Sequence, residues 1–145
     1  MSFALNAAET AFYSAHGYLV RESVFSPTEI SELQDAAECA ASRALAMADE
    51  GRSYILDQKR FIDVDRMTLQ FEQTLNSDLL RVIEPVDQLD PRLTSLVSDA
   101  RLADPMQQLV GSPNIALWTN KLNLKRPRQG SGFGWHQDSP YWIHD

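Results

Sequence analysis

The segment at residues 26–51 most strongly limits how this chain can fold. It opens with Ser-Pro-Thr-Glu at 26–29, in which Ser suits the N-cap, Pro the first helical position and Glu the capping-box position. The pattern predicts a helix to about Glu50, ended by Gly51. One face is apolar at helical spacing, which is typical of a helix packed on a core. The residues of this face are Ile30, Leu33, Ala37, Ala41, Ala44, Leu45 and Ala48.

The rest of the chain reads as further short helices and strands. No repeat or obvious linker divides the sequence, so a single domain over residues 1–145 is expected. The remaining predicted helices span 7–16, 77–89, about 91–97 after an Asp-Pro pair, and about 105–110 after a second Asp-Pro pair. The predicted strands span 18–20, 53–65 and 114–124, and a Gly-rich connection covers 126–134.

Composition narrows the class of protein. The net charge is −7, so no overall basic field is present for binding nucleic acid. The single cysteine, Cys39, cannot form a disulfide within the chain, which fits a reducing compartment. No stretch approaches the roughly 20 apolar residues that a membrane-spanning helix needs. We therefore expect a cytoplasmic protein without a nucleic-acid or membrane partner.

The chemically most informative feature is a His-x-Asp pair near the end of the chain. On a strand, residues i and i+2 point to the same face, so His136 and Asp138 would hold an imidazole and a carboxylate side by side. These are two of the three ligands of the 2-His-1-carboxylate facial triad, which binds Fe(II) and leaves positions open for oxygen and an organic cosubstrate. A surface histidine beside a solvated aspartate explains the same pair without a metal.

The surroundings of the pair resemble a known family. The segment 118–127, the Gly-rich loop and the Trp-His-Gln-Asp-Ser-Pro-Tyr-Trp sequence at 135–142 are similar to the phytanoyl-CoA dioxygenase family, and so are 12–20 and 24–30. The resemblance runs from about residue 9 to the end. It implies an α+β, mainly β fold, a double-stranded β-helix of the jelly-roll kind with N-terminal helices packed on one sheet. The helical layer would cover about 7–111 and the first barrel strands about 114–145, leaving the barrel incomplete in this chain.

The resemblance also implies an activity and its residues. It indicates an Fe(II)- and 2-oxoglutarate-dependent dioxygenase that uses O₂ to hydroxylate a small organic substrate. The residues concerned are His136 and Asp138 for the metal, Arg81, Lys121 and Asn123 for 2-oxoglutarate, and Tyr141 and Trp142 for the substrate. Arg81 is expected on the helix predicted at 77–89, where a solvated helix charge is an equally good interpretation. At their period-2 spacing, Lys121, Asn123 and Lys125 are expected to share one face. A plain aromatic edge to the core explains Tyr141 and Trp142 nearly as well.

The third metal ligand and a cosubstrate-binding arginine are expected downstream of Asp145. The chain is therefore interpreted as the N-terminal half of a longer enzyme, inactive alone, with unpaired strand edges that favour self-association. The alternative is a truncated, non-catalytic fragment, or a binding or assembly module with half a metal site.

Overall fold

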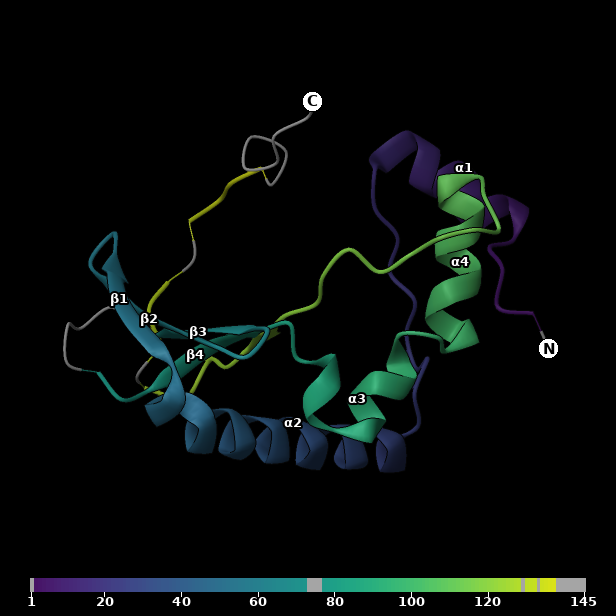
Figure 1. Cartoon of the computed structure of the whole chain (residues 1–145). Helices are drawn as coiled ribbons and strands as arrows, with labels where there is room; N and C mark the ends of the chain where they lie inside the picture. Colours follow the sequence, from purple (N-terminus) through teal and green to yellow (C-terminus); the bar gives the residue numbers. More distant parts are fainter. Residues whose placement is uncertain (1, 73–76, 129, 133, 138–145) are drawn as a thin grey trace.

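The molecule consists of a β-sheet lined by one long helix and, toward the other end, a pair of packed helices (Figure 1). The structure is a computed structural model, and the residues that it describes are 2–72, 77–128, 130–132 and 134–137.

The first two helices follow local sequence signals. α1 (Ala7–His16) begins at a capping box and ends at Gly17, whose φ of 77° is left-handed. α2 (Pro27–Met47) begins at Ser26 with the predicted capping box and runs into a 3-10 turn, η1 (Ala48–Glu50). The predictions over 7–16 and 26–50 are therefore confirmed.

The sheet has five antiparallel strands, each hydrogen-bonded to its neighbours in sequence order. The strands are β1 (Arg52–Leu56), β2 (Lys59–Val64), β3 (Met67–Phe71), β4 (Leu80–Glu84) and β5 (Leu122–Asn123). The strands predicted at 53–65 are confirmed as a hairpin. Its turn residues Asp57 and Gln58 both have positive φ, 48° and 62°, as the tight two-residue hairpin turn requires.

The core lies between α2 and the inner face of the sheet. α2 contributes Ala36, Ala40 and Ala44, which are spaced four residues apart and completely buried. Such small side chains let the helix backbone approach the strands closely. On the sheet, Leu69 of β3 and Ile83 of β4 are also completely buried, at the centre of the same arrangement. The core therefore backs the strands that carry the polar outer face described below.

The buried face of α2 is rotated relative to the predicted one. Ile30 and Leu45 were placed on the apolar face, but they are 42% and 43% exposed. The sheet covers only part of the surface of α2, and the covered part carries the alanine side chains. A helical pattern alone does not show which of two adjacent apolar stripes meets the neighbouring layer.

The helices after β4 lead away from the sheet and back. η2 (Asp87–Leu89) and α3 (Pro91–Leu96) pack against α2. α4 (Ala100–Val110) lies beside α1, as Figure 1 shows, and the Leu5 backbone N–H donates to the Gln108 side chain at 2.6 Å. The predicted helix at 91–97 is confirmed. Among the described residues, no helix is both long and apolar enough to cross a bilayer.

The helix predicted at 77–89 is wrong, because residues 80–84 form β4. This strand lies between β3 and β5 and is buried from Leu80 to Ile83, so its burial does not alternate. A short segment without alternation fits a buried strand as well as a helix, and here the β-branched Val82 and Ile83 favour the strand.

Three smaller predictions also need correction. Residues 18–20 are not a strand and pair with none of the described strands, and Val20 is 70% exposed. The strand predicted over 114–124 is limited to β5. α4 starts earlier than the second Asp-Pro pair, because Asp99 caps it by accepting from the Arg101 backbone N–H, and Pro105 lies inside the helix.

Candidate ligand pocket on the outer face of the sheet

On the face of the sheet that is turned away from α2, the side chains of neighbouring strands lie in rows, and most of these side chains are polar. In the strand register, Gln70 lies opposite Val82, which in turn lies opposite Asn123. Residues directly opposite one another project to the same face, so these three form one row. Glu84 lies two residues after Val82, and Lys121 lies two residues before Asn123. These two side chains therefore belong to the next row on the same face.

A pocket of about 440 Å³ lies over these rows. This volume is within the range of about 300–1,000 Å³ that small-molecule sites occupy. The expectation that Lys121, Asn123 and Lys125 share one face is confirmed, because all three line it. The lining residues are Gln70, Val82, Glu84, Lys121, Asn123, Lys125 and His136.

The charged side chains that line this pocket differ in whether a neighbouring group compensates their charge. Glu84 Oε2 lies 3.0 Å from Lys121 Nζ, and Glu84 Oε1 accepts a hydrogen bond of 3.0 Å from the Thr119 hydroxyl. Both carboxylate oxygens are therefore engaged, and the charge of Lys121 is compensated locally. Among the described residues, no carboxylate lies within ion-pair distance of Lys125.

The geometry at His136 fits a metal ligand. Its Nδ1 lies 2.8 Å from the carbonyl oxygen of Gly134. A carbonyl oxygen only accepts, so the neutral ring carries its proton on Nδ1 and has its lone pair on Nε2. A backbone carbonyl that fixes the tautomer in this way is a common outer partner of metal-bound histidine.

Asp138, the other predicted metal ligand, lies outside the described residues, as do Tyr141 and Trp142. Within the described part of the chain, no group of three or more His, Cys, Asp or Glu side chains is arranged to hold a metal ion. The metal assignment therefore depends on His136 and on a residue beyond the described ones, and it remains a prediction.

Arg81 does not lie where the sequence predicted. It sits on β4, and its carbonyl accepts from the Leu124 N–H at 2.7 Å, which puts it opposite a core residue on the inner side. Its side chain is 4% exposed. The guanidinium pairs with Glu72, with Nη1 3.3 Å from Oε2, while Nη2 donates to the Gly132 carbonyl at 3.3 Å. This placement separates Arg81 from Lys121 and Asn123, and it argues against the predicted contact with 2-oxoglutarate.

Sequence reasoning missed Gln70 and Glu84. Gln70 lies on β3, whose alternation of buried and half-buried residues is visible in the sequence Met-Thr-Leu-Gln-Phe at 67–71. That period of two could have identified the strand and the outward direction of Gln70. Glu84 was assigned to a helix, so its pairing with the strand that carries Lys121 could not be anticipated.

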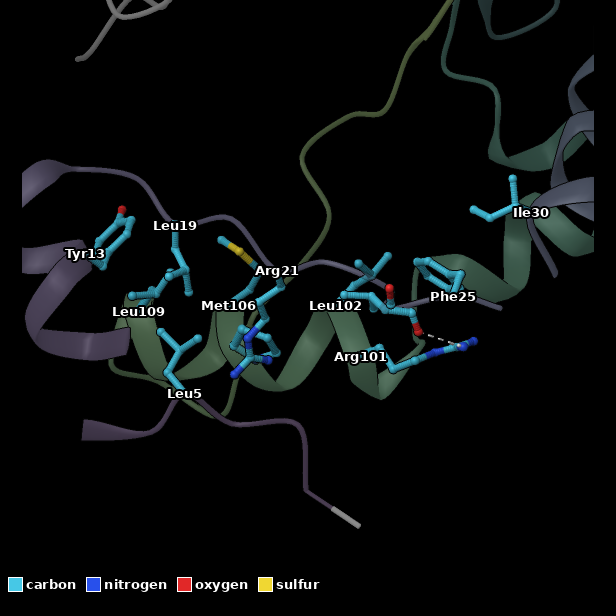
Figure 2. Close-up of a pocket in the computed structure, with 13 residues that line it drawn as sticks. Leu5, Tyr13, Leu19, Arg21, Phe25, Ile30, Arg101, Leu102, Met106 and Leu109 are labelled. Atoms are coloured by element: carbon cyan, nitrogen blue, oxygen red, sulfur yellow. Dashed lines mark hydrogen bonds between the residues drawn. The ribbon is translucent and has the colours of Figure 1, made fainter. Parts of the chain in front are cut away.

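A larger pocket of about 680 Å³ lies between α1, the segment 18–25 and α4 (Figure 2). Its lining is mainly apolar, and its two arginines are both occupied. Arg21 contacts both carboxylate oxygens of Glu9, at 2.8 and 2.7 Å. Arg101 contacts Asp99 and Glu29. Among the described residues, no other charged group lines this pocket. It therefore has fewer groups that could bind a polar ligand than the smaller pocket has.

Arg101 instead joins three segments of the chain. Its guanidinium lowers the pKa of Asp99 to about 2, with help from the Arg101 backbone N–H. The pKa of Glu29 is also lowered to about 2, first by the Ser26 backbone N–H at the start of α2 and then by Arg101. The cation further lies over the Phe25 ring, 4.2 Å from its centroid. The group thus fixes the start of α4 against the start of α2.

The comparison with known families decides the class of protein. The sequence profile of the phytanoyl-CoA dioxygenase (PhyH) family matches residues 13–145. The chain belongs to the phytanoyl-CoA dioxygenase family. The matched range includes the strands, the pocket and the His-x-Asp pair, so the resemblance noted from the sequence is confirmed.

Several curated proteins are similar to this family member. An ectoine dioxygenase of Sphingopyxis alaskensis is 28% identical over 138 residues, which are 95% of this chain and 39% of that protein. An ectoine dioxygenase of Bordetella bronchiseptica is 27% identical over 147 aligned positions, 96% of this chain and 39% of that protein. An L-proline trans-4-hydroxylase of Streptomyces griseoviridis is 29% identical over 69 residues, 48% of this chain and 25% of that protein.

The chain thus spans about two fifths of the length of the ectoine dioxygenases that it matches. No solved structure gives a significant match.

Proposed function

We propose that this chain is part of an Fe(II)- and 2-oxoglutarate-dependent dioxygenase that hydroxylates a small organic molecule, with O₂ as the second cosubstrate. The observation that carries the proposal is the pocket on the outer sheet face, which brings His136 together with Lys121 and Asn123. Family membership and the names of the relatives, which denote dioxygenases and a hydroxylase, support the same class of reaction.

In this proposal, His136, through the lone pair of Nε2, and Asp138 are the residues that would hold the iron. When bound, Fe(II) supplies the oxidation by O₂ that is coupled to decarboxylation of 2-oxoglutarate. The Gly134 carbonyl holds the imidazole in its orientation through Nδ1. Asn123 offers a carboxamide N–H to the cosubstrate, while Val82 gives the floor an apolar surface. Tyr141 and Trp142 are proposed to contact the substrate.

Arg81 and Lys121 are proposed to have supporting roles in this site. Arg81 holds the loop at 130–132 through Glu72 and Gly132, and this loop leads directly to His136. Lys121 borders the cosubstrate position in its pair with Glu84. The five-stranded sheet is proposed as the first layer of a double-stranded β-helix, completed by further strands in the whole protein, which would also supply the third metal ligand.

The competing proposal is a non-catalytic fragment, or a binding or assembly module. The observation in its favour is the share of the relatives' length that the chain spans, because two metal ligands bind Fe(II) weakly. We therefore expect no 2-oxoglutarate decarboxylation by the 145-residue chain alone. Turnover by the purified chain that is lost in His136→Ala would show that no further segment is needed.

The metal assignment can be tested separately from turnover. Mn(II) is titrated into the chain, and paramagnetic broadening of backbone NMR signals near Asn123 is measured. His136→Ala should abolish the broadening, while His16→Ala, which alters an exposed histidine at the end of α1, should leave it unchanged. Equal broadening in wild type and His136→Ala would exclude His136 as a ligand.

A further inference from the structure

The pocket contains one cation whose charge is not compensated by the described part of the chain. Lys121 is paired with Glu84 at 3.0 Å. Lys125 lines the same pocket, and no described carboxylate lies within ion-pair distance of it. Among the described residues that line this pocket, the ammonium of Lys125 is therefore the uncompensated positive charge that can attract an anion.

The backbone around Lys125 fixes the direction of its side chain. Leu124 is buried in the core, and its N–H is bonded to the Arg81 carbonyl, so the strand continues through this residue. Arg126 points the same way as Leu124, since both its terminal nitrogens contact Glu38 of α2, at 2.5 and 2.7 Å. Between two inward residues, Lys125 must project outward, on the face that carries Asn123.

We propose that Lys125 binds a carboxylate of the small-molecule ligand in this pocket. The proposal rests on the proposed function, because it takes a carboxylate of 2-oxoglutarate or of an amino-acid-like substrate as the anion. The ammonium group supplies up to three hydrogen-bond donors, and the Asn123 carboxamide two residues away supplies another. Lys121 lines the pocket as well, but its pair with Glu84 adds no net charge.

The test follows each lysine separately in the 145-residue chain. The lysines of the sequence are Lys59, Lys121 and Lys125. Reductive ¹³C-methylation labels each lysine and the N-terminal amine and retains the positive charge, so three of the four labelled amines report on the two pocket lysines and one control. Lys59 is on β2 and is not part of the pocket lining. 2-Oxoglutarate and L-proline are titrated in separate samples, which distinguishes a cosubstrate carboxylate from a substrate carboxylate.

We expect the Lys125 signal to shift with at least one of the two ligands while the Lys59 signal stays in place. Lys125→Gln should weaken binding of that ligand at least about tenfold, as expected for loss of a charge-assisted hydrogen bond, and Lys59→Gln should not. Lys121→Gln should weaken it less than about threefold, since its charge is already compensated.

Two results would overturn the assignment, and they differ in what else they reject. Binding that survives in Lys125→Gln and disappears in Lys121→Gln would reject the role of Lys125 alone and leave the proposed function in place. If neither ligand moves any lysine signal of the wild-type chain, the pocket does not bind carboxylates, and the proposed use of this face fails together with Lys125.

Discussion

The buried ion pair between Glu72 and Arg81 should contribute strongly to the stability of this chain. Both side chains are nearly inaccessible, at 9% and 4% exposure. Glu72 Oε2 also accepts hydrogen bonds from the Ser131 hydroxyl at 2.6 Å and from the Ser131 backbone N–H at 3.2 Å. Glu72→Ala removes all these contacts and leaves the Arg81 guanidinium buried without this carboxylate.

Removing one partner of a buried pair costs about 3–5 kcal/mol, because the charge left behind loses its compensation. We expect Glu72→Ala to reduce the free energy of unfolding by an amount in this range. Glu72→Gln keeps an oxygen that can accept from Ser131, and it should cost less. The matched control is Glu38→Ala, which breaks an ion pair whose side chains are 59% and 41% exposed, and this should cost no more than about 1 kcal/mol.

Urea unfolding followed by circular dichroism measures these differences, provided that the slope of the free energy with denaturant is unchanged. Because Ser131 and Gly132 precede His136, Glu72→Ala should also weaken the Mn(II)-induced broadening near Asn123. If Glu72→Ala cost as little as Glu38→Ala, the pair would not be buried, and the proposed support of the His136 loop would be refuted. Glu72→Gln keeps the comparison usable if Glu72→Ala does not fold.

Three further predictions concern other parts of the molecule. Gly51→Ala should lower the free energy of unfolding by about 1–3 kcal/mol, because its Cβ would overlap Ile62 Cγ2 and lie 2.9 Å from the Asp63 carbonyl oxygen; Gly132→Ala, with nothing within 4 Å, is the control in the same urea experiment. The carboxylates of Asp99 and Glu29 have folded-state pKa values of about 2, below their ordinary values of 3.8 and 4.5. The stability that they add is therefore fully present above the ordinary values and is lost as the pH falls from about 5 toward 2. The melting temperature should therefore fall over this range. The fall should be less steep in Arg101→Gln than in the control Arg66→Gln, which alters an exposed arginine in the turn between β2 and β3, and parallel curves would contradict this. The chain should also self-associate, since apolar side chains such as Leu117, at 50% exposure, and Val110, at 63%, remain open, and a concentration-independent monomer in sedimentation velocity would show otherwise.

The elements that the sequence predicted well are those whose signals are local. The capping box at Ser26 and the glycine after α1 involve residues within one turn of the helix that they delimit, and the structure confirms both. Gly51 was predicted as a helix stop, and the helix does end just before it. Its φ of −89° is not left-handed, however, and the glycine is required because β2 leaves no room for a side chain.

The pocket shows which relations between residues can be predicted from the alternation along one strand. Alternation along the strand correctly predicted that Lys121, Asn123 and Lys125 share a face, because that relation depends only on the backbone of one strand. Which charge faces which carboxylate depends on the neighbouring strand. The pairing of Glu84 with Lys121 follows from the register of β4 with β5, which residues far apart in the sequence establish together.

The regular alternation of β4 ends between Arg81 and Leu80, and the reason lies in the strand pairing. On β3, Gln70 pairs with Val82, but the next residue, Phe71, pairs with Leu80, so Arg81 has no partner on β3 and is the extra residue of a bulge. On the other side, β5 keeps its register and places Leu124 beside Arg81. Alternation from Ile83 and the pairing with Leu124 therefore give the guanidinium an inner position, where Glu72 compensates its charge and Gly132 accepts from it. Among the described residues that line the pocket on the outer face, the positive charges are therefore those of Lys121 and Lys125, which lie beside β5 and on its continuation.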